Sequence, residues 1–326
     1  MTEQRHSDAG LPLLSPSSIN FRAFDTSNSV LATVAPATLE RMVDLCRHLE
    51  GLLSRFIEGS DIWRINHSQG RPVEVSTHTV AVLSCAEQVR FLSHGAFNIA
   101  VGQATRLWRP SSKVLGPPSI SETNRIAKEL AGFRITIDGL QVRVSPGCEI
   151  DLGGIAKGYI CDQATDFLRE QGAASALLNF GGNVVAIGQH PQGRPWKVGL
   201  QTPGSEREQH IFATLEASDT AIVTSGIYER GLAVEDRFYH HILNPRTCRP
   251  SESELVSVSV IAKDSMLADA LATAILVLGN EDGMALATRF NAGLVLLQNN
   301  GTLSSSQGLA LEPVSATNVN VALPIT

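Results

Sequence analysis

The chain has 326 residues, of which 43% are hydrophobic and 18% are charged, and this balance excludes a disordered protein. Its formal net charge of −6 argues against nucleic acid as a partner, because neutralising phosphates requires a basic surface. The longest apolar candidate for a membrane span, residues 274–278, is too short to cross a bilayer, so we expect no membrane partner.

The first ten residues contain no apolar stretch behind a basic patch, so we expect no secretory leader. The five cysteines are scattered, odd in number and without CxxC spacing. This pattern is typical of reduced thiols in a cytoplasmic protein. We expect a flexible polar segment over residues 1–19 and one domain over residues 20–326.

In the first half of the chain, apolar residues at three- and four-residue spacing predict a helix over residues 38–56, with Thr38 as its N-cap. A second helix is expected over residues 77–94. Residues 109–123, rich in Pro, Ser and Gly, predict a loop. Alternating apolar residues around Asp138-Gly139 predict a hairpin.

In the second half, a helix is expected to follow Gly153-Gly154 and to end at Gly172. The remaining expected elements are strands over residues 175–180, 184–187 and 255–261, a helix over residues 265–278 and a hairpin over residues 294–303. The interleaved order predicts an α+β fold, a mixed α/β, sandwich-like single unit of strands and helices.

The segment DLGGIAKG, residues 151–158, places two glycines between an expected strand and an expected helix. Glycines let the backbone approach a ligand closely, and the free amides of a helix start favour an anion such as phosphate. Lys157 adds a positive charge in the first turn, where the helix dipole does not favour one. A tight turn with a surface lysine fits the same pattern, so both interpretations stay open.

Asp269 and Thr273 lie four residues apart in an expected helix that is otherwise almost entirely apolar. The spacing puts both side chains on one face, and the surroundings predict burial. A buried carboxylate requires a compensating partner or cation. A carboxylate with a hydroxyl suits Mg²⁺, which prefers oxygen ligands. The open alternative is that Asp269 pairs with a buried Arg or caps a neighbouring turn.

Two histidines precede a turn at Asn244-Pro245, and Arg246 follows it. His241 could act as a general base near neutral pH, and Arg246 could hold a phosphate. A structural role in the turn is equally open for His241.

Two further segments offer groups for a ligand. Thr224 and Ser225 end an expected strand with hydroxyls that could bind a polar ligand or satisfy the backbone. Ser225 lacks the GxSxG context of a serine nucleophile. The GAFNIAVG segment, residues 95–102, could line a site for a flat heterocycle or belong to the core.

Each pattern is weak alone, but their order along the chain is specific. The blocks DLGGIAKGY, NFGGNVVAIG, TSGIYER, HHILNPRT and DSMLADALATAILVLG resemble the FAD:protein FMN transferase family, also called ApbE. The SRF block at residues 54–56, the SDIWRIN block at residues 60–66 and GAFNIAVG fit the same series. The resemblance runs from about Asn20 to Gly308 and implies an ApbE-like domain.

The resemblance implies an enzyme that cleaves FAD with the help of Mg²⁺ and transfers FMN to a Ser or Thr hydroxyl of a client protein, releasing AMP. The implied base is His241. The implied metal ligands are Gly154, Asp269, Thr273 and, more weakly, Ala272. The implied FAD contacts are Phe56, Ala96, Phe97, Asn98, Asp151, Lys157, Thr224, Ser225 and Ile242.

Three positions depart from the family pattern. Asn98 and Asn244 stand where the family usually has Asp, and Cys248 stands where it usually has Gly. Asn98 keeps the shape of Asp without its charge, and Cys248 suggests a reshaped turn behind His241. Two alternative functions therefore stay open: an FAD pyrophosphatase that gives FMN and AMP, and an FAD-binding protein without turnover.

Overall fold

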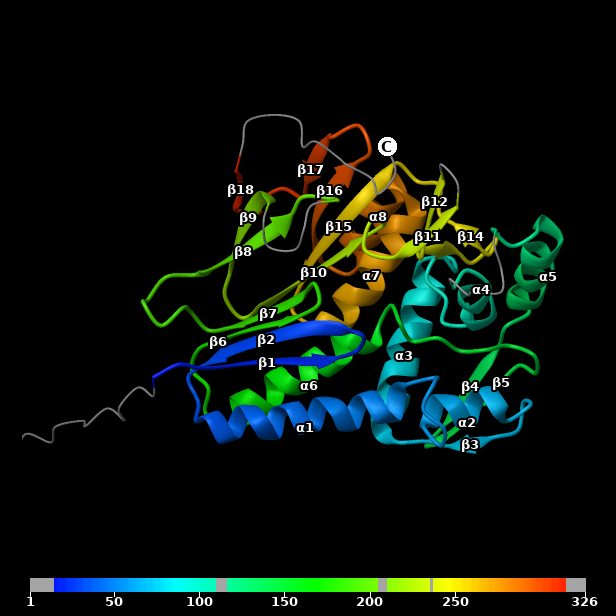
Figure 1. Cartoon of the computed structure of the whole chain (residues 1–326), viewed down its shortest axis with the longest axis horizontal. Helices are drawn as coiled ribbons and strands as arrows, with labels where there is room; N and C mark the ends of the chain where they lie inside the picture. The colour runs from blue at the N-terminus through cyan, green and yellow to red at the C-terminus, as the bar shows by residue number, and fades with distance from the viewer. Residues whose placement is uncertain (1–14, 110–115, 205–209, 235–236, 315–326) are drawn as a thin grey trace, which may run out of the picture.

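An eight-stranded antiparallel sheet forms the centre of the computed structural model, which describes residues 15–109, 116–204, 210–234 and 237–314 (Figure 1). The strand order is β1-β2-β6-β7-β10-β15-β16-β17, with antiparallel neighbours throughout. The strands are β1 (Ser17–Ala23), β2 (Thr26–Ala32), β6 (Ala176–Phe180), β7 (Asn183–Ile187), β10 (Thr220–Gly226), β15 (Leu255–Ala262), β16 (Gly293–Gln298) and β17 (Leu303–Ser305). An antiparallel sheet with segregated helices confirms the predicted α+β class.

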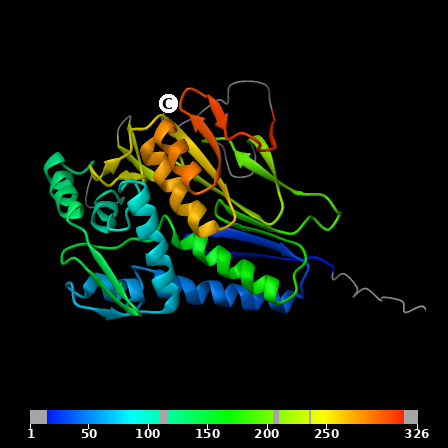
Figure 2. The ribbon, with the colours of Figure 1, turned by 180° about the vertical axis from the view of Figure 1, so that it is seen from behind.

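Four helices lie in a row on one face of this sheet (Figures 1 and 2). They are α1 (Pro36–Leu53), α6 (Ala156–Glu170), α7 (Ser265–Leu278) and α8 (Asn280–Arg289). α1 packs on β1, α6 on β6 and β7, α7 on β7, β10 and β15, and α8 on β16, and each helix also contacts the next. The apolar faces of these helices and of the sheet form the core.

The remaining elements flank this layer. The helices are α2 (Asp61–His67), α3 (Thr77–Leu92), α4 (Gly102–Leu107) and α5 (Ile120–Ala131). Small sheets are formed by β3 (Val73–Glu74), β5 (Gln141–Val144) and β4 (Ile135–Asp138); by β18 (Leu311–Pro313), β9 (Ile211–Ala217) and β8 (Trp196–Gln201); by β11 (Gly231–Val234) and β12 (Arg237–His240); and by β13 (Leu243–Asn244) and β14 (Arg249–Pro250). α3 packs on α7, which joins this flank to the main layer.

The strongest sequence patterns predicted their elements closely. The helix expected over residues 265–278 coincides with α7, and the helix expected over residues 77–94 is α3 with Ser76 as N-cap. The hairpin predicted at Asp138-Gly139 joins β4 to β5, and Gly139 takes the left-handed φ of +57° that such a turn requires. The run after Gly154 forms α6, which ends before Gly172.

Three expectations were wrong in detail. Thr38 is not an N-cap, because α1 begins two residues earlier at Pro36, whose fixed φ suits the first helical position. The loop expected over residues 109–123 ends at Ser119, because Ser119 and Glu122 form a capping box that starts α5; residues 110–115 lie outside the described residues. Glu149 forms an isolated bridge with Val101 rather than the strand expected before Asp151.

The N-terminal boundary expected at residue 19 falls inside β1, which begins at Ser17. Residues 1–14 lie outside the described part of the chain. In the part that the structure describes, none of the helices has the length and apolarity that a bilayer span requires.

Candidate functional site

The expected metal ligands meet where the turn before α6 touches α7. A Cβ atom built on Gly154 would lie 3.0 Å from Thr273 Oγ1 and 3.4 Å from the Phe97 ring, so both side chains closely approach the Gly154 backbone. Asp269 lies one turn before Thr273 on α7, and its Oδ2 accepts a hydrogen bond from the Gly158 amide at 3.0 Å. Tertiary structure thus brings Gly154 close to Thr273 and Gly158 close to Asp269, and the metal site implied by the resemblance stays a prediction.

The donor set at this point fits a hard divalent cation. Asp269 is 3% exposed, and among the described residues no cationic side chain pairs with it. A buried carboxylate held by one amide keeps acceptor capacity for a cation, and the Thr273 hydroxyl adds a second hard oxygen. Of the two alternatives for Asp269, a buried Arg partner is absent from the described residues. The other is observed, because the bond from the Gly158 amide makes Asp269 a cap of the first turn of α6. Ala272 is fully buried on the same helix, and a role for its backbone carbonyl rests on the resemblance alone.

Lys157 reaches across to the turn between β6 and β7. Its Nζ donates to Asn183 Oδ1 at 2.6 Å and to the Gly181 carbonyl at 3.4 Å. Asn183 is fully buried, and its Nδ2 has no hydrogen-bond partner among the described residues. Sequence reasoning placed Asn183 in a turn and missed it as a site residue, although the NFGGN block carried the signal.

The two adjacent histidines have different environments. His240 is buried, and one ring nitrogen contacts the Ser251 carbonyl at 3.0 Å; burial lowers its pKa. His241 is exposed, and both its amide and its Nδ1 bond the Arg230 carbonyl, at 3.1 and 3.0 Å. Because a carbonyl only accepts, Nδ1 carries the proton and Nε2 is left as the basic nitrogen.

The pKa of His241 is lowered from 6.5 to about 4, mainly because surrounding protein atoms exclude water from the imidazolium, and the charge of Lys157 acts in the same direction. A neutral imidazole at physiological pH is the form that a general base requires.

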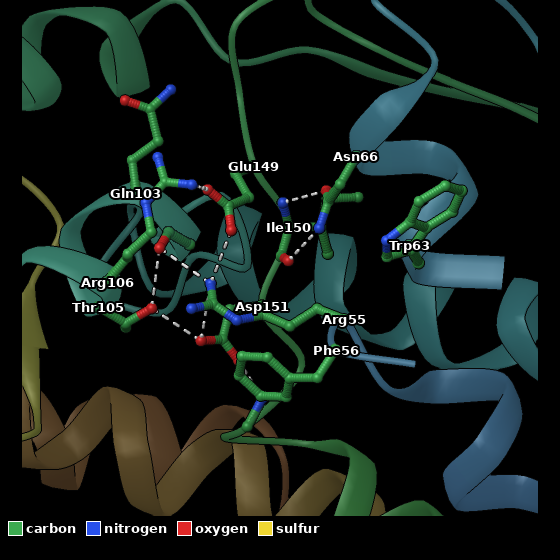
Figure 3. Close-up of polar contacts among 12 residues, drawn as sticks. Arg55, Phe56, Trp63, Asn66, Gln103, Thr105, Arg106, Glu149, Ile150 and Asp151 are labelled. Carbon is green, nitrogen blue, oxygen red and sulfur yellow. Dashed lines mark hydrogen bonds and ion pairs between the residues drawn. The ribbon is translucent and has the colours of Figure 1, made fainter. Parts of the chain in front are cut away.

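Asp151 is held in an ion-pair network (Figure 3). Its Oδ2 accepts from Thr105 Oγ1 at 2.8 Å and lies 3.4 Å from Arg55 Nη1, while its Oδ1 accepts from the Gly153 amide at 2.9 Å. Arg55 also pairs with Glu149 at 3.2 Å. These contacts fix the turn that carries Gly154, and the FAD contact implied for Asp151 stays a prediction.

Aromatic residues expected to contact FAD lie on both sides of this turn. Phe56 is 60% exposed, and its ring centroid lies 4.9 Å from the Arg55 guanidinium carbon and 4.3 Å from that of Arg109. Phe97 is buried against Gly154. An exposed aromatic ring flanked by two guanidinium groups suits stacking with a flat anionic ligand.

The residues around Phe97 are buried. Ala96 is 6% exposed, and Asn98 Oδ1 accepts from the Ala100 amide at 2.9 Å. An aspartate could accept the same bond, so the amide keeps the local turn, as its shape predicted.

Ile242 is also buried, and its carbonyl accepts a hydrogen bond from the Ser251 amide.

The structure separates the hydroxyls of Thr224 and Ser225. Successive residues of a strand point to opposite faces, and both lie in β10. Thr224 Oγ1 forms a 2.7 Å hydrogen bond with Ser259 Oγ on β15, and the Thr224 amide bonds the Gly182 carbonyl. The two side chains therefore do not line one surface together.

The turn after His241 keeps a glycine-like backbone without a glycine. Cys248 has a φ of +54° and is fully buried, and its carbonyl accepts from Trp108 Nε1 at 2.8 Å. Arg246 donates to the His94 carbonyl at 3.2 Å, so it ties this turn to the end of α3. The left-handed conformation at Cys248 is that of a glycine, so the backbone gives no sign of the reshaped turn that the substitution suggested.

The fold is that of solved flavin transferases. The chain superposes on the flavin transferase ApbE from Vibrio cholerae with a TM-score of 0.77, at 26% identity, over 90% of this chain and 98% of that one. The ApbE protein from Thermotoga maritima gives a TM-score of 0.81 at 28% identity, over 90% and 97% of the two chains.

Sequence comparison leads to the same group. A protein named FAD:protein FMN transferase from Klebsiella pneumoniae is 34% identical over 287 residues, which cover 86% of this chain and 89% of that protein. One of the same name from Vibrio cholerae is 32% identical over 256 residues, covering 77% and 76%. The ApbE family model matches residues 19–297. The chain belongs to the ApbE family.

Proposed function

We propose that this protein is an FAD:protein FMN transferase, which moves FMN from FAD to a Ser or Thr hydroxyl of a client protein and releases AMP. The observation that carries the proposal is the approach of the Gly154 turn to Thr273 and of the start of α6 to Asp269, with Lys157 in the same first turn of α6. The names of the relatives and of the solved structures support the same reaction.

We propose that Mg²⁺ is held by the Gly154 carbonyl, by Asp269 and by Thr273, with the Ala272 carbonyl as a further ligand. When bound, the cation would neutralise phosphate oxygens of the dinucleotide. Lys157 would add a positive charge to the same diphosphate. Phe56 would stack on a ring of FAD, and Phe97 would pack beside the Gly154 turn.

The transfer requires one proton acceptor. The client hydroxyl oxygen forms a bond to the phosphorus of the FMN half, and the bond from that phosphorus to the bridging oxygen breaks, so AMP leaves with that oxygen. The hydroxyl proton moves to Nε2 of His241, which Arg230 orients through Nδ1. General-base assistance of this kind contributes on the order of a hundredfold to ten-thousandfold.

The test is incubation of the purified protein with FAD, MgCl2 and a flavoprotein client. We expect a covalently fluorescent client band and an equal amount of AMP, both abolished by EDTA. His241→Ala should abolish the band while FAD binding is retained. If the His241→Ala variant labels the client as well as the wild type does, His241 is not the base. If the wild type labels the client in the presence of EDTA, the reaction does not require a metal ion.

A second candidate is hydrolysis of FAD to FMN and AMP, with water in place of the client hydroxyl, since part of the His241 residue is exposed to solvent. Chromatography of FAD incubated with the protein and MgCl2, without client, distinguishes the two reactions. Rapid release of FMN would favour hydrolysis.

We propose that the protein meets its client in a reducing compartment, the cytoplasm. All five cysteines are free, and burial raises the pKa of the Cys46, Cys85, Cys148, Cys161 and Cys248 thiols. Thiols of this kind are neither disulfide-bonded nor reactive. Tracking a fluorescent fusion in cell fractions would test the location.

A further inference from the structure

The N-terminus of α7 is capped by a side chain from another helix. The residue at its own N-cap position, Asp264, makes no side-chain capping bond. Instead Asp162, in the middle of α6, accepts the first two amides of α7: Oδ1 from Ser265 N and Oδ2 from Met266 N, each at 2.8 Å. Amides at a helix start have no partner within the helix, so this carboxylate replaces the missing cap.

A second contact between the same two helices lies one turn earlier on α6. Gly158 and Asp162 are four residues apart, so they share a helix face. A Cβ atom on Gly158 would lie 2.7 Å from Met266 Cα, which means that the two backbones touch. The Gly158 amide in turn donates to Asp269 Oδ2 at 3.0 Å. α6 and α7 lie side by side on the sheet (green and orange in Figure 2).

These contacts link the two halves of the proposed metal site. The Gly154 turn leads directly into α6, whereas Asp269 and Thr273 lie on α7. The two chain segments are more than a hundred residues apart in sequence, so only packing between the helices sets the distance from Gly154 to the pair on α7. A small sliding of one helix along the other would separate the oxygen ligands.

We propose that Asp162 is a positioning residue, which holds the start of α7 against α6 and thereby sets the affinity of the Gly154–Asp269–Thr273 site for a divalent cation. The inference rests on the proposed function. Asp162 itself touches neither Asp269 nor Thr273 and acts through the first turn of α7. Burial raises the pKa of Asp162 to about 7, and the hydrogen bonds from the two amides oppose that rise.

The test compares Asp162→Asn with Asp166→Asn. Asn has nearly the volume of Asp, but its side chain has only one acceptor oxygen. One of the two oxygens that accept the amides of α7 is therefore replaced by an NH2 group, which cannot accept. Asp166 is the matched control: it lies one turn further along α6, its side chain is 61% exposed, and it pairs with Arg169 rather than with α7. Mn²⁺ is titrated into each protein with FAD present and client absent, and free Mn²⁺ is followed by its electron paramagnetic resonance signal against a blank of FAD alone.

We expect Asp162→Asn to raise the Mn²⁺ dissociation constant by about 10- to 100-fold, the usual effect of losing a residue that orients metal ligands. FAD affinity in EDTA should be unchanged. The melting temperature should fall by several degrees, because one amide at the start of α7 loses its acceptor, so Mn²⁺ affinity is compared at a temperature at which all variants are folded. Asp166→Asn should leave all three quantities unchanged. Equal Mn²⁺ affinity in the wild type and Asp162→Asn, or an equal loss in Asp166→Asn, would overturn the inference.

A measurement on the wild type covers the case in which Asp162→Asn does not fold. Because coupling between two sites is reciprocal, Mn²⁺ with FAD should slow hydrogen exchange at the Ser265 and Met266 amides, although neither is an expected ligand. Unchanged exchange at both amides would refute the positioning role. If the wild type binds no Mn²⁺ at all, the proposed metal site fails and this inference fails with it; if only the Asp162 effects are missing, the metal site stands.

Discussion

Variants of Lys157 and Asn183 can distinguish an effect on the stability of the fold from an effect on flavin transfer. Lys157→Met keeps the length of the side chain and removes the ammonium that bonds Asn183 Oδ1 at 2.6 Å. Asn183 is fully buried, and among the described residues its Nδ2 already lacks a partner, so the variant leaves both ends of a buried amide unpaired. Loss of a charged hydrogen bond to a buried acceptor lowers the free energy of unfolding by about 1.5–3 kcal/mol.

A second substitution distinguishes this effect from catalysis. Removing both partners of a buried hydrogen bond is nearly neutral, so Lys157→Met with Asn183→Leu should recover most of the lost stability. The double variant still lacks the positive charge proposed to act on the diphosphate. Its kcat/KM for flavin transfer should therefore stay about 100- to 1,000-fold below the wild type, the usual effect of losing one electrostatic contact to a developing charge.

The assay is urea unfolding followed by circular dichroism for the wild type, both single variants and the double variant, with client labelling measured on the same samples. The interpretation depends on the order of the four proteins in each assay. If Lys157→Met and the wild type unfold at the same urea concentration, the hydrogen bond between Lys157 and Asn183 does not contribute to the stability of the fold. If the double variant regains transfer, Lys157 has only a structural role.

Two further predictions concern the base and the exposed aromatic ring. Because the pKa of His241 is lowered from 6.5 to about 4, its neutral form persists at lower pH. In a pH profile of kcat/KM, the acid limb should therefore have its midpoint below pH 6.5, toward about 4. A midpoint at or above pH 6.5 would contradict this prediction. Phe56→Ala should raise the KM for FAD about 3- to 10-fold through lost stacking, measured by steady-state kinetics. Phe91→Ala is the control, since this ring is 76% exposed on α3, and an equal effect of both variants would show that Phe56 is not specific.

Local patterns in the sequence were sufficient for several elements near the site. α7 was predicted at its observed ends because it is apolar on nearly all sides, a pattern that only a buried helix accommodates. The Asp138-Gly139 turn was predicted because its backbone angles depend on the two residues themselves. A local signal was also overlooked: Ser119 and Glu122 form a capping box that was present in the sequence and starts α5.

Long-range pairing decided the rest. Asp151 is bonded to Arg55 and Thr105, and no spacing along the chain predicts partners 46 or 96 residues away. Asn183 became part of the site only when packing of α6 on β7 brought Lys157 to it. The four-residue spacing placed Asp269 and Thr273 on one helix face, and the helix–helix contact brought Gly154 to them. Sequence determines what depends on neighbours along the chain, whereas the distance between α6 and α7 depends on side chains that meet only after folding.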